Sequence, residues 1–447
     1  MTGDGRSASS EAIWLDGVPS HWSIDRLKWS IAGLFNGVWG DEPNGIDDII
    51  CVRVADFDRT HFKVANDPPT RRAVEIKDRV NRLLHPGDML IEKSGGGDNQ
   101  PVGCVVYFDQ RYDAICSNFI GRMVVAAGMH SRYWSYEHAA LYAGRLNIPA
   151  IKQTTGIQNL DTDAYFNLRV AYPPFDEQRA IANYLDRETA QIDALVAAKE
   201  RLLTLLAEKR RALITRAVTR GLNSDVPLRE SGLPWLGEVP AHWEVTRLKF
   251  VADVQGGLAL GKNYGAADTA EYPYLRVANV QDGYLDLSEI TTVLVPENEA
   301  KSCLLQSGDV LMNEGGDADK LGRGCIWLGE INPCLHQNHV FAVRPKLIRS
   351  EWLDAWTSTD TAKAYFESRA KQSTNLASIS GTNIKELPIL VPPDEEQRAI
   401  VAHIAAETAR LDALAAATKR SIALLKERRA ALIAAAVTGR MQISEAA

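Results

Sequence analysis

The sequence predicts an α+β fold in which two mixed α/β bodies are separated by two long antiparallel helices, with an internal pseudo-two-fold repeat. Block 14–28 returns as 235–249 with nine of fifteen residues identical, and block 173–219 returns as 392–438 with 26 of 47 identical. The longer blocks have the apolar spacing of coiled-coil-like helices. The segments between the blocks contain short Val-, Ile- and aromatic-rich runs broken by Gly, Asn, Asp and Pro, which indicate strands.

The two longer blocks are predicted to begin and end as helices do. Each starts with a Pro-Pro pair after an apolar run, which suits a first helical turn, and acidic residues follow where the helix dipole favours them. Gly221 and Gly439 then end the pattern. Because some seam positions are polar, we expect two helices packed on each other rather than a strict zipper. The predicted seam consists of Ile181, Leu185, Ile192, Leu195, Leu202, Leu206 and Leu213, and of Ile400, Ile404, Leu411, Leu414, Leu425 and Leu432.

The two bodies are predicted to share a scaffold and to differ in their loops. Weak matches persist through them: VRVAD at 52–56 answers LRVAN at 275–279, and GDML at 87–90 answers GDVL at 308–311. Between these matches the copies diverge, and loops are where recognition usually lies. The expected division of the chain is 1–172, 173–222, 223–391 and 392–447.

Composition and charge exclude several classes of protein. The 447 residues carry a net charge of −7 and are 45% hydrophobic, without a run of eighteen apolar residues or a signal peptide. The six cysteines form no CxxC pair and no zinc-ligand spacing, so we expect buried thiols and a cytoplasmic location. The helical blocks are slightly basic and the remaining chain is strongly acidic. Any DNA contact would therefore be local, or shared with a positively charged partner.

The sequence contains no convincing catalytic motif. The segment around Tyr172 resembles the Pro-Pro loop of amino-methyltransferases but lacks the required Asn or Asp, and a helix start explains both copies. The Gly-rich run that ends at Asn263 resembles a phosphate-binding loop but lacks the final Ser or Thr. His21 and His242 recur in the same context without a catalytic partner at a suitable spacing. We therefore predict no catalytic residue, no metal site and no enzyme activity.

Two repeated motifs resemble those of the specificity (S) subunit of Type I restriction-modification enzymes. G-x-P-x-x-W-x-x-x-R-L occurs at 17–27, and P-P-x-x-E-Q-x-x-I occurs at 173–181 and again at 392–400. The second copy of the first motif departs from the pattern, because Glu238 stands in the place of Gly17. The resemblance covers nearly the whole chain.

The resemblance implies a non-catalytic DNA-recognition subunit that takes part in defence against foreign DNA. Two target recognition domains, 1–172 and 223–391, would each read one half of a bipartite, asymmetric double-stranded target. The helices would set the gap and dock two methyltransferase (M) subunits, and motor-nuclease (R) subunits would join the complex. No cofactor is expected in this chain. S-adenosylmethionine, ATP and Mg are expected on the partner subunits.

Polar loop residues are the candidates for contact with DNA, because such side chains suit base edges and phosphates. The alternative for each residue singly is a solvated loop. Lys152–Thr155 and Lys371–Thr374 have nearly the same sequence, so they suit the DNA backbone or the fold better than base recognition. The candidates are Lys93, Ser94, Asn99, Gln100, Lys152, Gln153 and Thr155 in the first body, and Asn313, Lys320, Arg323, Lys371, Gln372 and Thr374 in the second.

Two other functions are weighed against DNA recognition. A structural adaptor would bind protein partners through its helices and would show no sequence-dependent DNA binding. A self-sufficient restriction enzyme would need cofactor and nuclease motifs, and the repeat leaves no room for them.

Overall fold

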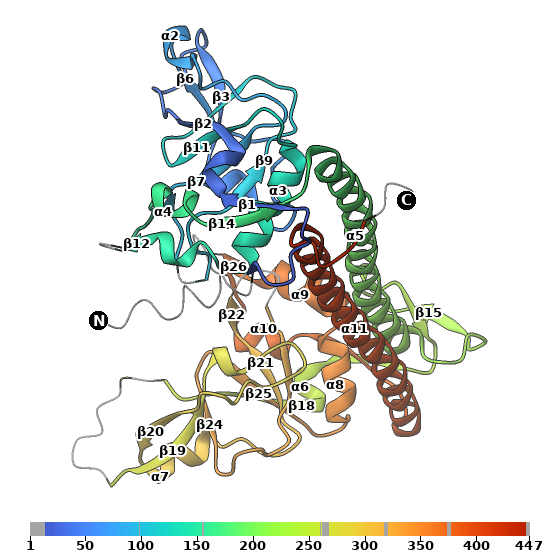
Figure 1. The fold of residues 1–447 in the computed structure, drawn as a ribbon. Coiled ribbons are helices and arrows are strands. Elements are labelled where there is room, and N and C mark those ends of the chain that lie inside the picture. The colour runs from blue at the N-terminus through green and yellow to red at the C-terminus, as the bar shows by residue number, and fades with distance from the viewer. Residues whose placement is uncertain are drawn as a thin grey trace. The chain divides into compact units, whose positions relative to one another are not determined.

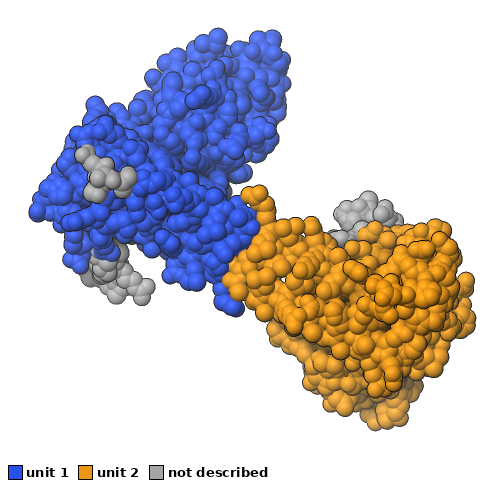
Figure 2. All heavy atoms as spheres, turned by 90° about the vertical axis from the view of Figure 1, so that its right-hand side faces the viewer, with its two compact units in different colours: residues 1–199, 420–447 blue, residues 200–419 orange. Residues whose placement is uncertain are grey.

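The computed structural model describes residues 14–97, 99–153, 156–259, 261, 268–316, 321–372 and 377–443, and it confirms the predicted fold class (Figure 1). The two long helices are α5 (Phe175–Arg220) and α11 (Asp394–Val437). The chain divides into two compact units, which Figure 2 colours separately: residues 1–199 with 420–447 form unit 1, and residues 200–419 form unit 2. Each unit therefore contains one mixed body and one part of each long helix.

The body of unit 1 is built on a six-stranded sheet whose order is β2-β11-β7-β9-β5-β4. Its centre is antiparallel and buried, with Met89, Ile91 and Met123 without solvent exposure. Helix α3 (Ser131–Ala143) packs against β9. The strands are β2 (Ile31–Asn36), β4 (Phe57–Asp58), β5 (Lys63–Val64), β7 (Met89–Glu92), β9 (Val105–Tyr107) and β11 (Ile120–Val125). A second sheet contains β10 (Ala114–Cys116), β3 (Asp48–Val52) and β6 (Arg71–Ala73).

The body of unit 2 repeats this scaffold. Its main sheet has the order β18-β25-β21-β23, which corresponds to β2-β11-β7-β9 of unit 1. The strands are β18 (Ala252–Gly256), β21 (Val310–Asn313), β23 (Gly324–Ile326) and β25 (Val340–Pro345), and α8 (Ser350–Thr357) takes the place of α3. A second sheet contains β19 (Ala270–Leu275), β20 (Thr291–Val295) and β24 (Leu335–His336). The weak match between 87–90 and 308–311 therefore marks the shared central strands β7 and β21, whereas the match between 52–56 and 275–279 marks the ends of β3 and β19 and the turns that follow them.

The repeated N-terminal strip is the segment 14–28 in unit 1 and 235–249 in unit 2. In each unit its side chains form hydrogen bonds with the first turn of the long helix that follows. In unit 1 the Trp22 indole donates to Glu177 at 3.1 Å, and His21 contacts the other oxygen of that carboxylate at 2.9 Å. In unit 2 Trp243 and His242 make the same contacts with Glu396, at 2.9 and 2.7 Å. The His-Trp pair and the motif glutamate are therefore structural partners, which explains why they recur together without catalytic neighbours.

The motif glutamines join the long helices to α3 and α8. The Gln178 side chain donates to the Pro173 carbonyl at 2.9 Å and accepts from the His130 amide at 2.9 Å. Gln397 repeats both bonds, to the Pro392 carbonyl at 2.9 Å and from the Arg349 amide at 3.1 Å. Both glutamines are buried, so each satisfies a buried carbonyl and an amide at a helix start that would otherwise lack partners.

Each unit contains an antiparallel pairing of the two long helices. In unit 1 the N-terminal part of α5 shares a core with the C-terminal part of α11. In unit 2 the C-terminal part of α5 shares a core with the N-terminal part of α11. The core of unit 1 includes Ile181, Leu185, Ile433 and Ala436. The core of unit 2 includes Ile214, Ala217, Ile400 and Ile404.

A repeated ion pair marks the register of the two helices. In unit 1 the Arg429 guanidinium donates to Asp193 at 2.9 Å. In unit 2 Arg210 approaches Asp412 at 3.6 Å. Asp412 is the repeat counterpart of Asp193, and Arg429 is that of Arg210. The same contact is thus made twice, with the two helices exchanging roles, as an antiparallel pair of repeated helices requires.

The predicted seam needs a correction at three leucines. Leu195, Leu202 and Leu414 are 46%, 36% and 47% exposed and do not lie in a buried seam. Polar residues occupy buried positions instead: Thr189, Thr408 and Thr418 are at most 8% exposed. Their hydroxyls donate to the carbonyls of Leu185, Ile404 and Leu414, four residues back, at 2.6 to 2.8 Å, which removes the cost of burying them.

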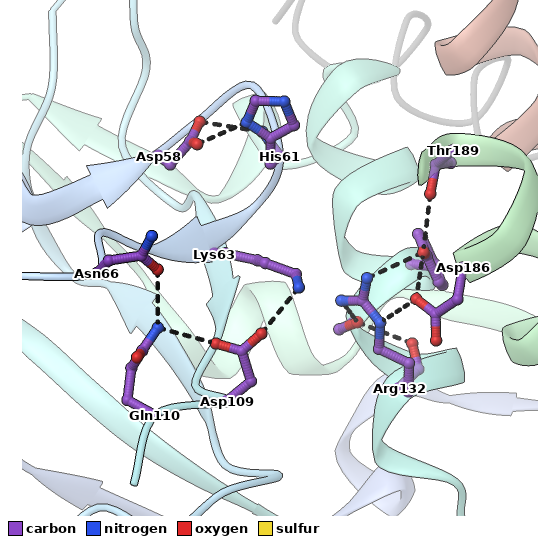
Figure 3. Close-up of polar contacts among 11 residues, drawn as sticks. Asp58, His61, Lys63, Asn66, Asp109, Gln110, Arg132, Asp186 and Thr189 are labelled. Carbon is purple, nitrogen blue, oxygen red and sulfur yellow. Dashed lines mark hydrogen bonds and ion pairs between the residues drawn. The ribbon is translucent and has the colours of Figure 1, made fainter. Parts of the chain in front are cut away.

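Helix α3 is joined to α5 by a polar cluster, shown in Figure 3. Arg132 donates to Asp186 Oδ1 at 2.7 Å (Figure 3). The Tyr136 hydroxyl also donates to Asp186 Oδ1 at 2.7 Å, and it lies 3.3 Å from the Thr189 hydroxyl. The Arg132 guanidinium lies 4.4 Å from the centre of the Tyr136 ring, within reach of a cation–π interaction. Unit 2 has Ala355 and Ala405 at the positions of Tyr136 and Asp186, so this polar cluster occurs in unit 1 alone of the two units.

A buried carboxyl group in α3 predicts pH-dependent stability. Burial raises the pKa of Glu137 to about 8, despite the nearby Trp14 indole. The folded state therefore holds a proton that the unfolded state releases above about pH 4.5, so this contribution to stability is lost as pH rises toward 8. Glu137→Gln should leave the free energy of unfolding nearly unchanged at pH 5 and raise it by about 2–4 kcal/mol at pH 8.

Chemical denaturation of both proteins at pH 5, 6.5 and 8 measures this difference. Burial lowers the pKa of the adjacent His138 to about 3, which weakens the fold as pH falls below 6.5. That contribution is common to both proteins and cancels in the comparison. A gain in stability that is the same at all three pH values would contradict the assignment to Glu137.

Candidate nucleic-acid interface

One small sheet in each unit contains some of the candidate residues. In unit 1, β13 (Gln158–Leu160) pairs with both β8 (Ser94–Gly95) and β12 (Ile151–Gln153). In unit 2, β27 (Ala377–Ser378) pairs with both β22 (Gly315–Gly316) and β26 (Lys371–Gln372). The two candidate groups of the first body, which lie about sixty residues apart in sequence, therefore meet in one sheet.

The small sheet of unit 1 has a polar, partly exposed surface. The Lys93 ammonium donates to Asn36 at 2.5 Å, and partial burial lowers the pKa of Lys93. The Ser94 hydroxyl donates to the Asn159 side chain at 2.6 Å. Asn159 is exposed and lies opposite both Ser94 and Lys152, although it is not among the candidates predicted from the sequence. It lies between Gln158 and Leu160 in the sequence, and only the strand pairing shows its central place.

Of the other candidates in unit 1, Lys152 and Gln153 lie in the edge strand β12, and Asn99 and Gln100 lie in the loop after β8. Lys152 forms an ion pair with Asp161 at 2.6 Å, and Gln153 is exposed beside it. Asn99 and Gln100 are exposed in a turn closed by hydrogen bonds between the backbones of Gly97 and Gln100. Thr155 lies outside the described residues.

In unit 2 one candidate needs a correction. Asn313 is 1% exposed, and its amide donates to the Val280 carbonyl at 2.9 Å. Its side chain holds the loop that follows β19 and does not reach a base edge. Arg323 is half-buried, and its carbonyl accepts from the Asn313 amide at 3.0 Å. Lys371 is exposed, whereas Lys320, Thr374 and the side chain of Gln372 lie outside the described residues.

The two small sheets share a backbone arrangement but differ in side chains. The amide of Lys93 donates to the Phe119 carbonyl at 2.8 Å, and the amide of Glu314 donates to the His339 carbonyl at 2.9 Å, so these pairs occupy equivalent positions. The side chains at these positions differ. Phe119 is an aromatic residue that is 52% exposed, and its counterpart His339 forms a hydrogen bond of 2.6 Å with the Glu314 carboxylate. Asn159 of unit 1 corresponds to Ser378 of unit 2. The position that holds a basic and an aromatic residue in unit 1 therefore holds an acidic residue and an imidazole in unit 2.

The described part of the chain contains no grouping of three or more His, Cys, Asp or Glu side chains suited to a metal ion. All six cysteines are buried and free, as predicted. Among the helices of the described residues, none is long and apolar enough to cross a membrane.

Comparison with known proteins agrees with the repeated architecture. The family model described as "Type I restriction modification DNA specificity domain" matches residues 240–422. The EcoKI specificity subunit of Escherichia coli K12 is 24% identical over 81% of this chain and 76% of its own length. The StySPI specificity subunit of Salmonella potsdam is 24% identical over 73% of this chain and 68% of its own.

Solved structures show the same fold. The HsdS subunit from Thermoanaerobacter tengcongensis covers 95% of this chain and 98% of its own, with a TM-score of 0.54 and 17% identity. A chain from a study of assembly and conformational transition of the type I R-M system covers 95% of this chain and 99% of its own, with a TM-score of 0.64 and 18% identity.

The family model and the relatives agree that the chain is similar to DNA specificity subunits. The similarity is to the specificity subunits of Type I restriction enzymes, and the two alignments described above span 73% and 81% of this chain.

Proposed function

We propose that the chain reads a split, asymmetric DNA target, and that the body of each unit reads one half. This proposal is supported by the two small sheets, which share a backbone arrangement but differ in their side chains. Lysine suits the O6 and N7 acceptors of guanine, whereas a glutamate suits the amino group of cytosine. Because Lys93 and Glu314 occupy equivalent positions, the two half-sites should differ in sequence.

A reconstituted complex with methyltransferase subunits tests this proposal, with modified bases sequenced in its DNA product. The wild type should methylate a split motif. The double variant Lys93→Ala/Asn159→Ala should relax one half of that motif only, and Glu314→Ala/His339→Ala should relax the other half only. We expect each to cost about 1–3 kcal/mol per misread base pair.

Lys152→Ala is the matched control, because its counterpart Lys371 is also lysine and cannot carry different specificity. It should weaken binding to all sequences about equally and leave the motif unchanged. Methylation that is independent of sequence would contradict the proposal, as would variants of one unit that alter both halves.

The long helices also carry surfaces that suit protein partners. Leu195 and Leu424 of unit 1 are 46% and 65% exposed, and Leu205 and Leu414 of unit 2 are 60% and 47% exposed. Leu414 is the repeat counterpart of Leu195, and Leu424 is that of Leu205. Each unit thus exposes an equivalent pair of leucines, one from each helix. We infer that the two pairs dock two copies of one partner, the methyltransferase subunit.

The remaining chemistry belongs to the partners in this proposal. The methyltransferase subunits would bind S-adenosylmethionine, and motor-nuclease subunits that join the complex would use ATP and Mg. Positive charge on these partners would compensate the net charge of −7 of this chain near DNA phosphates. The free thiols suit the reducing cytoplasm.

A further inference from the structure

An exposed aromatic side chain occurs at the same place in both units, directly after the N-terminal strip. Trp29 is 57% exposed and Phe250 is 63% exposed. In each case the preceding lysine lies over the ring, with Lys28 Nζ 5.0 Å and Lys249 Nζ 5.2 Å from the ring centre. The local arrangement of a basic group and an exposed ring is therefore the same in both copies.

Packing of the body does not account for these rings. Their neighbours Leu27 and Leu248 are fully buried and anchor the segment, whereas Trp29 and Phe250 point away from the core. Single exposed apolar residues are common and need no explanation. Here the same exposed position is aromatic in two copies whose surfaces have otherwise diverged, which indicates a task that both units share.

The shared task is not base recognition. A surface that is alike in both units cannot select two different half-sites. The rings also lie away from the small sheets: β2 begins at Ile31, beside Trp29, and ends at Asn36, which accepts the Lys93 bond. Six residues of strand span about 20 Å. Trp29 therefore lies at the opposite end of β2 from the candidate DNA surface.

Charge favours a protein over the DNA backbone as the partner. In unit 2, Glu386 is bonded to both Arg247 and Lys249 at 2.6 Å, so a carboxylate lies within the basic group beside Phe250. A phosphate-binding surface gains from uncompensated positive charge, and this one is partly compensated. Aromatic side chains are enriched among the central residues of protein–protein interfaces.

We propose that Trp29 and Phe250 are equivalent anchors for two copies of one protein partner, the methyltransferase subunit, and that each unit contacts one copy. This inference rests on the proposed function, and it adds a second contact to the one assigned to the exposed leucines of α5 and α11. The lysine beside each ring would face acidic groups on the partner.

The test uses the full-length chain and its methyltransferase subunit, with stoichiometry from native mass spectrometry and affinity from calorimetry. Trp29→Ala and Phe250→Ala should each weaken one of the two binding events at least tenfold. The double variant should form no two-to-one complex at concentrations that saturate the wild type. Ile46→Ala and Tyr284→Ala are matched controls, since these residues are 86% and 61% exposed, and both should bind as the wild type does.

Three outcomes would overturn the inference. The double variant could bind two subunits within twofold of the wild-type affinity. It could instead keep its stoichiometry and lose DNA affinity, which would make the rings a DNA contact. A wild-type chain that binds no methyltransferase would refute the proposed docking itself, before any variant is made. Thermal unfolding of each variant, with Trp29→Gln and Phe250→Gln as a second set, separates lost binding from lost folding.

Discussion

Insertion of seven residues into both long helices, after Lys199 in α5 and after Lys419 in α11, should widen the gap of the DNA target by about three base pairs. Seven residues are one heptad, so the apolar faces of the helices remain aligned. Each helix gains about 10 Å at 1.5 Å per residue. DNA rises about 3.4 Å per base pair, and the two half-sites should separate accordingly.

Sequencing of modified bases in DNA methylated by the reconstituted variant measures the new gap. The bases within each half-site should stay the same, because the small sheets are untouched. The same insertion in α5 alone is the control, and it should abolish the complex, because the ion pairs Asp193–Arg429 and Arg210–Asp412 can then no longer form together. An unchanged gap in the double insertion would disprove that helix length sets the spacing.

Loss of Asp193 should destabilise the chain far more than loss of its repeat counterpart Asp412. In unit 1 the Arg429 side chain is 10% exposed and Asp193 is 26% exposed, so removing the carboxylate leaves a nearly buried cation without this partner. We expect Asp193→Ala to lower the free energy of unfolding by about 3 kcal/mol. Arg210 and Asp412 are 45% and 63% exposed, and Asp412→Ala should cost less than about 1 kcal/mol.

Denaturant unfolding of the two variants side by side gives this difference, and each serves as the control for the other. Adding Arg429→Met to Asp193→Ala should recover much of the lost stability, because the buried charge is then removed. Equal losses in the two single variants would show that burial does not distinguish the two ion pairs.

The helices were predictable from sequence because their signals are local. The Pro-Pro pairs, the acidic first turns and the final glycines placed both helices within a few residues of their observed ends. The residues that lie between the two helices were less predictable, because leucines were expected at these buried positions in preference to polar residues. Thr189 and Thr418 are buried because each hydroxyl bonds to its own helix, and the leucines at 195 and 414 face solvent instead.

The candidate DNA surface was predicted only in outline. The small sheet of unit 1 joins both groups of polar residues that were selected there, and their contact with DNA stays a prediction. Asn159 and Phe119 were missed, because their positions depend on pairing between strands far apart in sequence. Asn313 was selected because it is polar and follows an apolar run, yet that polarity supports the backbone of a neighbouring loop.

The division of each long helix between the two units has a consequence for the order of folding. Unit 2 is one continuous stretch, 200–419, whereas unit 1 combines the first 199 residues with the last ones from 420 onward. During synthesis the first body emerges early, but Ile433 and Ala436 must be made before they can cover Ile181 and Leu185. The body made first is therefore completed after the body of unit 2 has been made, and its apolar helix face stays exposed to chaperones or to misassembly until then.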